Sequence, residues 1–384
     1  MLWLRLLLKN AFRHRLRAAL TILGLVVAIA SFGLLRTIVD AWYAGVKASS
    51  SARLIVRSAT SLVIPLPLAY AERLRAVEGV TAISWSNWFG GVYVEPRNFF
   101  PQFAVDARSY LPLYPEFVLP EDQKLEWLRD RRGVVVGRTL ADKFGWKLGD
   151  TIALRGTIYS GTWTFTLRGI FDGAEPGTDT GQMLMHWQYV NETMRARGRA
   201  GDAVGVYVVG IREPENAPLV SARIDAQFRN SRAETLTETE QAFQLGFVAM
   251  SEAILLALQA VSYIVVVIIL AVMANTVAMG VRERASEYAT LKAVGFGPPA
   301  VAALVAGESL VLALAGGLVA VALTLPLAAA FAGVAGSMFP AFLVSRETIA
   351  LQLAVAAAVG LLAAAWPAWR MGRLDIVAGL RQIA

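Results

Sequence analysis

The segment Ala253–Gly280 contains no charged residue. A run of about 18 or more residues without charge is typical of a transmembrane helix, because hydrocarbon solvates neither charges nor open backbone groups. Similar apolar segments begin at Ala18, near Ala300 and near Thr348. The sequence therefore predicts four membrane spans, and a long segment of mixed composition, 41–245, separates the first span from the other three.

Composition agrees with a membrane protein and excludes several kinds of site. The chain is 56% hydrophobic and 17% charged, with a mean hydropathy of +0.52. Its net charge of +7 gathers beside the spans, which favours contact with lipid headgroups over nucleic-acid binding. There is no cysteine and there are two histidines, His14 and His186, so neither disulfides nor a thiolate or imidazole metal cluster is expected.

The distribution of basic residues predicts the topology. Residues 1–17 form a basic amphipathic segment suited to the headgroup layer, and we expect the first span to stay uncleaved, since the basic region is too long for a signal peptide. The N-terminal flank, segment 281–298 and the tail 370–384 are all basic. Because basic residues favour the cytoplasmic side, both termini are predicted to be cytoplasmic. The predicted order is 1–17 interfacial helix, 18–40 first span, 41–245 extracytoplasmic domain, 246–280 stalk and second span, 281–298 cytoplasmic loop, 299–332 third span, 333–347 exterior loop, 348–369 fourth span and 370–384 tail.

The exterior segment has the alternating pattern of a mixed α/β domain. Gly133–Gly145 predicts a strand followed by a helix, and 147–154 with 162–170 predicts a hairpin. Residues 238–247 are predicted to be helical and to continue without a break into the second span. The predicted fold class is an α-helical membrane protein with four transmembrane helices and an α/β domain inserted between helices 1 and 2.

The loop between the second and third spans has a helical pattern of its own. Ala285, Tyr288, Leu291 and Val294 recur at three-residue steps, and Gly295 is a stop signal. This loop is either a solvated turn that holds the topology or a docking helix for a cytoplasmic partner. Glu283 and Glu287 are four residues apart, where like charges repel, and Arg284 offsets this only partly. A partner that supplies cations would relieve the repulsion.

Two features of the spans allow more than one interpretation. Glu308 lies inside the third span, where an ionisable group is a functional candidate, although near the cytoplasmic end it could simply accept a bond from a neighbouring polar group. Ala356, Gly360 and Ala364 recur every four residues. Such a stripe of small residues lets helices approach closely, either in a dimer or within one chain.

No catalytic or nucleotide-binding motif is found in the sequence. Gly133 and Gly137 are separated by three residues and followed by no lysine, whereas a P-loop needs four residues and the lysine. Neither His-Glu-x-x-His nor a nucleophile–base pattern has support. The chain is therefore predicted not to be an enzyme and to hold no cofactor; any ATP would be bound by another subunit.

Four motifs, in order, resemble the FtsX-like and MacB-type ABC-transporter permeases. The loop carries Val281-Arg-Glu-Arg284, Glu287, Leu291-Lys-Ala293 and Gly295-Phe296, similar to the family's VRER-E-x-x-x-LKA-x-GF signature. The start, from Asn10 to Gly24, and the tail Pro367-Ala-Trp-Arg370 with Asp375 are also similar, although Ile376 stands where the family has proline. Residues 134–154 resemble the MacB-type periplasmic core domain. The chain resembles the stand-alone four-span kind, without a fused ATPase.

The resemblance implies a permease subunit that transmits ATP-driven motion from a separate cytoplasmic ATPase to its periplasmic domain. It implies a bacterial inner-membrane location, a second permease copy or paralogue in a homo- or heterodimer, and export or release of a hydrophobic or lipoprotein-like cargo, with a periplasmic adaptor as a further partner. The ATPase contact would then be formed by Arg282, Glu283, Arg284, Glu287, Tyr288, Leu291, Lys292, Gly295 and Phe296.

Two other functions are weighed against this one. A membrane-anchored sensor or scaffold would bind a ligand through its exterior domain and recruit no ATPase, so an ATPase reading frame beside this one would favour the permease. A secondary transporter is weakly supported, because four spans with one lone carboxylate offer no inverted repeat.

Overall fold

The computed structural model describes residues 2–175, 177–199, 201–335 and 342–373. Part of the predicted exterior loop 333–347, namely 336–341, and most of the predicted tail, including Asp375, Ile376 and Arg381, lie outside the described residues. The chain forms two compact units. One is helical and is built from residues up to Asp40 and from Glu252 onward; the other is an α/β unit, Ala41–Ser251.

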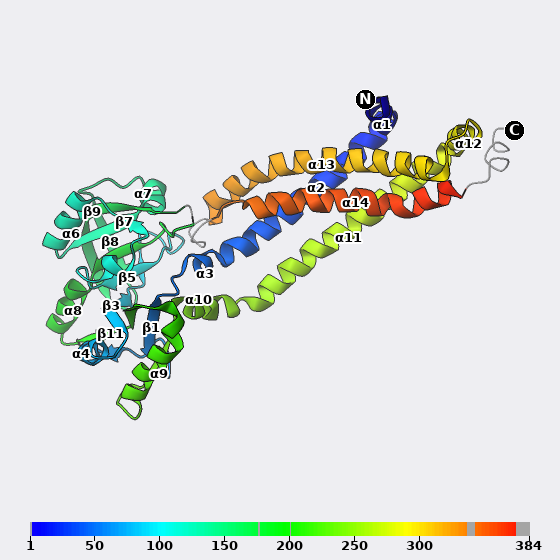
Figure 1. The fold of residues 1–384 in the computed structure, drawn as a ribbon. Coiled ribbons are helices and arrows are strands. Elements are labelled where there is room, and N and C mark those ends of the chain that lie inside the picture. Colours follow the sequence, from blue (N-terminus) through cyan, green and yellow to red (C-terminus); the bar gives the residue numbers. More distant parts are fainter. Residues whose placement is uncertain (1, 176, 200, 336–341, 374–384) are drawn as a thin grey trace. The chain divides into compact units, whose positions relative to one another are not determined.

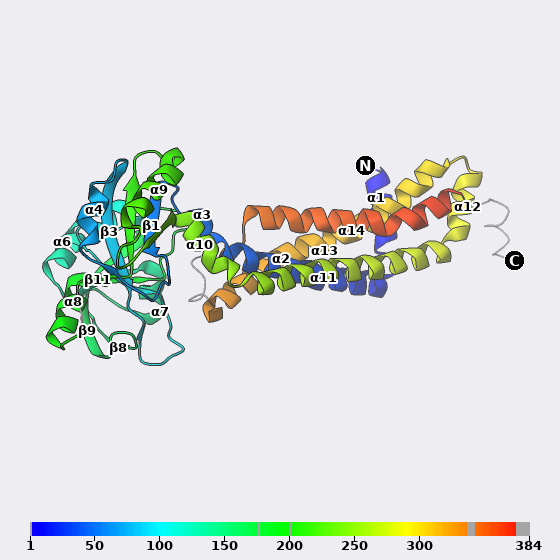
Figure 2. The ribbon, with the colours of Figure 1, turned by 90° about the horizontal axis from the view of Figure 1, so that it is seen from below.

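The helical unit contains four helices long and apolar enough to cross a membrane. They are α2 (Arg15–Trp42), α11 (Glu252–Glu283), α13 (Pro298–Ala335) and α14 (Arg346–Gly372). Figures 1 and 2 both show them alongside one another. Two short helices complete the unit, α1 (Leu2–Ala11) and α12 (Ala285–Ala293). The prediction of four spans with an α/β domain between the first and second is confirmed.

Small residues bring the long helices close together. A Cβ added at Gly360 would lie 2.7 Å from the Ala313 Cβ, and one added at Gly317 would lie 2.6 Å from the Ala356 Cβ. Ala356 and Ala364 have no exposed surface. The small-residue stripe of α14 therefore packs within the chain, which is the second of the two roles considered for it, and is not left open for a dimer contact.

The α/β unit is built on a long mixed sheet. Its strand order is β13-β1-β12-β3-β5-β10-β7-β9-β8-β4, with β6 paired to β9, and β2 and β11 form a separate pair. Strands β5 and β10, and β7 and β9, are parallel; the remaining neighbours are antiparallel. The strands are β1 (Arg53–Ser58), β2 (Leu66–Pro67), β3 (Val80–Trp88), β4 (Gly91–Val92), β5 (Gln102–Val105), β6 (Phe117–Val118), β7 (Gly133–Gly137), β8 (Thr151–Gly156), β9 (Gly161–Gly173), β10 (Met183–His186), β11 (Ala203–Val204), β12 (Val206–Ile211) and β13 (Thr235–Thr239).

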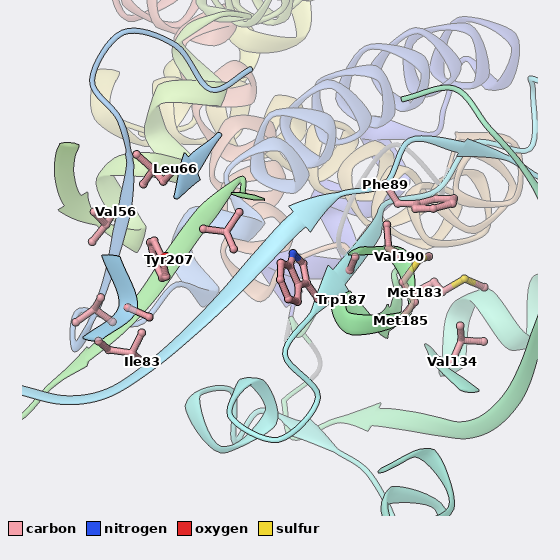
Figure 3. Close-up of a cluster of buried hydrophobic side chains, with 14 of the residues drawn as sticks. Val56, Leu66, Ile83, Phe89, Val134, Met183, Met185, Trp187, Val190 and Tyr207 are labelled. Carbon is pink, nitrogen blue, oxygen red and sulfur yellow. The ribbon is translucent and has the colours of Figure 1, made fainter. Parts of the chain in front are cut away.

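Apolar side chains bury the sheet from both faces. One cluster includes Val134, Met183, Trp187 and Tyr207, shown in Figure 3. A second cluster includes Trp127 of α6 and strand residues that alternate with those of the first cluster. This alternation follows from the two-residue period of a strand. The helices of this unit are α3 (Ala44–Ala48), α4 (Tyr70–Arg75), α5 (Tyr110–Leu113), α6 (Glu121–Arg129), α7 (Arg138–Phe144), α8 (Trp187–Ala196), α9 (Ala217–Phe228) and α10 (Glu240–Ala249).

The expected unbroken helix into the second span is wrong. Helix α10 ends at Ala249, and α11 begins at Glu252. Ser251 stands immediately before α11, and serine is a residue that favours the position before a new helix over the interior of an old one. Two helices joined by a short connection therefore lead from the sheet to the span.

Candidate coupling site

The segment between the second and third spans folds as the separate helix α12. Its end has the hydrogen bonds of a Schellman motif: the Phe296 amide donates to the Leu291 carbonyl over 3.0 Å, and the Gly295 amide donates to the Lys292 carbonyl over 3.0 Å. Gly295 has a φ of +108°, a conformation that favours glycine. The stop signal at Gly295 thus sets where α12 ends.

One face of α12 is fixed to the bundle by apolar contacts. Ala285, Tyr288 and Ala289 are buried, and Tyr288 is 2% exposed. Tyr288 belongs to a cluster drawn from α11, α13 and α14, with Val281, Val301, Val305, Ala364, Ala368 and Met371. Burial raises the pKa of the Tyr288 hydroxyl, which stays protonated at neutral pH. Helix α12 is therefore packed as part of the helical unit.

A network of charges joins α12 to the third span. Arg284 Nη1 donates to Glu308 Oε2 over 2.7 Å, and Arg284 Nε donates to Glu287 Oε2 over 2.9 Å. Both the Arg284 and Glu308 side chains are largely buried, at 13% and 15% exposed. Burial alone would lower the pKa of the guanidinium, but Tyr288, Glu287 and Glu308 outweigh it and raise that pKa. Glu308 is thus ion-paired near one end of its span, as the simpler of its two expected roles requires.

The start of the chain completes the network. Asn10 Nδ2 donates to Glu308 Oε1 over 2.9 Å. Arg13 lies 2.5 Å from Glu287, and Arg17 holds both carboxylate oxygens of Glu283 at 2.7 and 2.8 Å. The segment from Asn10 to Arg17 therefore contacts α12, the end of α11 and α13 at once.

These contacts correct the idea that a partner must supply the cations. Arg17 and Arg13, from this chain, neutralise the two glutamates four residues apart. Burial of Glu287 would raise its pKa, but the hydrogen bonds from Arg284 and Arg13 outweigh it and lower that pKa. The sequence does not distinguish these two arginines from the neighbouring Arg15. Only the fold shows that Arg13 and Arg17 reach the two glutamates.

The remaining expected contact residues differ in how far they are accessible. Arg282 is exposed, Leu291 is half-buried, and Lys292 Nζ donates to the Gly372 carbonyl over 2.8 Å. Beyond α12, Val294 is 75% exposed and Phe296 is 37% exposed. The segment Ala293–Gly297, which we call the apolar tip, is thus the accessible part of the site. Val294 had been expected to share the helix face of Tyr288 and was not predicted as a contact.

Comparisons with known proteins place this arrangement in a family. Residues 18–227 match the MacB-like periplasmic core domain, and residues 260–376 match the FtsX-like permease C-terminal region. No curated protein matches the chain.

Two solved structures resemble it over about half its length. The extracellular domain of the noncanonic ABC-type transporter YknZ from Gram-positive bacteria is 10% identical and covers 49% of this chain and 100% of its own, with a TM-score of 0.35. A domain of a putative permease from Porphyromonas gingivalis is 15% identical and covers 49% of this chain and 88% of its own, with a TM-score of 0.32.

The first family match spans more than half of the chain, and the second covers the last three membrane helices and α12. The chain therefore belongs to the family of ABC-transporter permeases that have a MacB-like periplasmic core domain and an FtsX-like permease region, and it is a multi-pass membrane protein.

Proposed function

We propose that this chain binds a separate cytoplasmic ATPase through α12 and transmits ATP-driven motion to its extracytoplasmic domain. The observation that carries the proposal is the contrast within one short segment. The back of α12 is anchored by Tyr288 and the Arg284–Glu308 pair, whereas the apolar tip is exposed at Val294. A rigidly held helix with an accessible apolar end is suited to receive force from a partner.

The contacts that anchor α12 indicate how a force applied to the apolar tip would be transmitted to the membrane helices. Arg284 and Glu287 connect α12 to α13 and to the start of the chain, and Arg17 with Glu283 connects α2 to the end of α11. Ion pairs of this kind hold orientation more than they add stability. With the contacts of Tyr288 and Lys292 to α14, displacement of α12 would therefore be shared by all four spans.

The same proposal covers location and cargo. We propose that both termini and α12 lie on the cytoplasmic side of a bacterial inner membrane; the basic flanks support this orientation. The permease would act with a second permease subunit, identical or related, and its cargo would be hydrophobic or lipoprotein-like and exported or released on the outer side. ATP would be bound by the ATPase alone.

Co-purification tests the proposal. Val294→Asp should weaken capture of the neighbouring P-loop ATPase by about tenfold, as loss of a central apolar contact does in other interfaces. Val63→Asp is the matched control, because Val63 is 89% exposed but lies in the α/β unit; it should leave capture unchanged. Equal capture by the wild type and Val294→Asp would exclude the apolar tip as the ATPase contact, and no ATPase with the wild type would favour the scaffold instead.

A further inference from the structure

A buried arginine in the α/β unit has acceptors at all three nitrogens of its guanidinium. Arg53 Nε donates to Glu240 over 2.8 Å, and Nη2 lies 2.7 Å from the same Glu240 oxygen. Nη1 donates to the Leu113 carbonyl over 2.9 Å and to Glu116 over 3.1 Å, while Nη2 donates to Glu116 over 2.5 Å. The three nitrogens of the planar fork are thus held by two carboxylates and one carbonyl.

The surroundings bury and orient Arg53 and Glu240, whereas the Glu116 side chain is 25% exposed. The Arg53 and Glu240 side chains are 7% and 8% exposed. The guanidinium carbon lies 4.2 Å from the centre of the Tyr114 ring, which itself stacks on Tyr110 at 4.5 Å. Charges in such a place contribute strongly to a single geometry, and removing one partner leaves the other unpaired.

The cluster lies where the chain enters and leaves the extracytoplasmic domain. Arg53 begins β1, the first strand after the first span, and Glu240 begins α10, the helix that precedes the second span. In the antiparallel β1–β13 ladder Leu54 faces Thr239, so Arg53 and Glu240 occupy the next position along. The amide of Ser50 also donates to Glu240 over 3.0 Å, and α3 packs against α10.

We propose that the Arg53–Glu240–Glu116 cluster is a joint that makes the two connections of the extracytoplasmic domain to the membrane move as one. Displacement delivered to α10 is passed through Glu240 to Ser50 and β1, and through Arg53 to Glu116 beside β6. The role of the cluster in transmitting ATP-driven motion rests on the proposed function. The linkage of the two connections through the cluster does not.

The joint is tested first without the ATPase, by amide hydrogen exchange of the full-length chain in lipid nanodiscs. Arg53→Lys keeps the charge but has three donors in no fixed fork, and Glu240→Gln keeps the shape but not the charge. Each variant should speed exchange at least about tenfold in both 49–54 and 240–245, since local opening there becomes easier. Exchange in β7 and β10 should stay unchanged.

Arg57→Lys is the matched control. Arg57 lies on the same strand and pairs with Glu238 over 2.7 Å, but its side chain is 21% exposed. Arg57→Lys should leave amide hydrogen exchange in segments 49–54 and 240–245 unchanged. The proposal is overturned if the two segments respond separately, if Arg57→Lys acts equally, or if both cluster variants speed exchange throughout the domain, which would indicate overall stability instead.

A second readout connects the joint to ATP-driven motion. In the assembled complex ATP should change amide exchange in 49–54 and 240–245 together in the wild type but not in Arg53→Lys, while ATP turnover stays within about twofold of the wild type; the same paired change in Arg53→Lys would count against a joint. If no ATPase assembles with the wild type, the proposed function fails while the exchange result still decides the joint.

Discussion

Arg284 Nη1 and Glu308 Oε2 lie 2.7 Å apart, which joins the residue between α11 and α12 to the third span. Glu308 alone in a span would suggest a transport carboxylate. With Arg284 and Asn10 as its partners, it holds the position of α12 instead. The first two predictions concern this network.

Loss of Glu308 should be costly to stability. Glu308→Ala removes the carboxylate that accepts from Arg284 Nη1 and leaves the bond from Nε to Glu287; breaking a buried pair costs about 3–5 kcal/mol, and the remaining bond places the loss near the lower figure. Thermal unfolding of the purified chain measures this, and the double variant Arg284→Met with Glu308→Leu should recover most of the loss. Arg282→Gln, at an exposed neighbouring residue, is the control. A Glu308→Ala effect as small as that of the control would disprove the buried pair.

Glu287→Lys should weaken ATPase capture without preventing membrane insertion, because it sets α12 against Arg13 and Arg284. The exposed Arg13–Glu287 pair itself adds under about 1 kcal/mol to stability. Adding Arg13→Glu should restore part of the capture measured by co-purification. If the double variant stays as defective as Glu287→Lys alone, Glu287 acts on the ATPase directly and not through Arg13.

Gly33→Ala should destabilise the bundle. An added Cβ would lie 2.1 Å from Gln352 Nε2, a buried amide that donates to the Ile29 carbonyl over 3.0 Å. Forcing a methyl group into such a contact costs about 1–3 kcal/mol. Gly24→Ala, in the same helix, meets only Ile269 Cδ1 at an ordinary 3.4 Å and should be close to neutral in thermal unfolding. Equal effects of the two substitutions would contradict the close approach at Gly33.

Acid should destabilise the extracytoplasmic domain through His186. Burial lowers the pKa of this imidazole below 6.5, and the bond to the Trp127 carbonyl, 2.8 Å from Nε2, offsets this only in part. The folded state therefore binds the proton less well than the unfolded state, so stability is complete above pH 6.5 and falls as pH drops below it. The slope is at most about 1.4 kcal/mol per pH unit. His186→Gln should flatten the fluorescence-monitored unfolding curve between pH 7 and 5; an unchanged slope would assign the acid sensitivity elsewhere.

The four membrane helices could be predicted from the sequence because their causes are local. Charge-free runs such as Ala253–Gly280 need no knowledge of the fold to be recognised as helices that cross a bilayer. The stop at Gly295 is local as well, since a left-handed position at a helix end favours glycine. The long mixed sheet follows less directly, because its strand order depends on pairings between distant segments such as β5 and β10.

The candidate site could be located from the sequence, but the residues of this chain that pair with it could not. The loop signature pointed to α12, while the cations that neutralise Glu283 and Glu287 lie some 270 positions earlier in the chain, with separations of 266 and 274. Arg13 and Arg17 look like ordinary headgroup-binding residues until the fold brings them to α12. The Arg53 cluster is hidden for the same reason, since Arg53 and Glu240 meet only through the β1–β13 ladder.

The most direct test of the central claim is photo-crosslinking from the apolar tip in living cells. A photoreactive amino acid replaces Val294, and a second chain with the same group at Val63 serves as the control. The account predicts a crosslinked band that contains a P-loop ATPase from position 294 and none from position 63. A crosslink from position 294 to extracytoplasmic proteins alone, or no ATPase in any band, would contradict it.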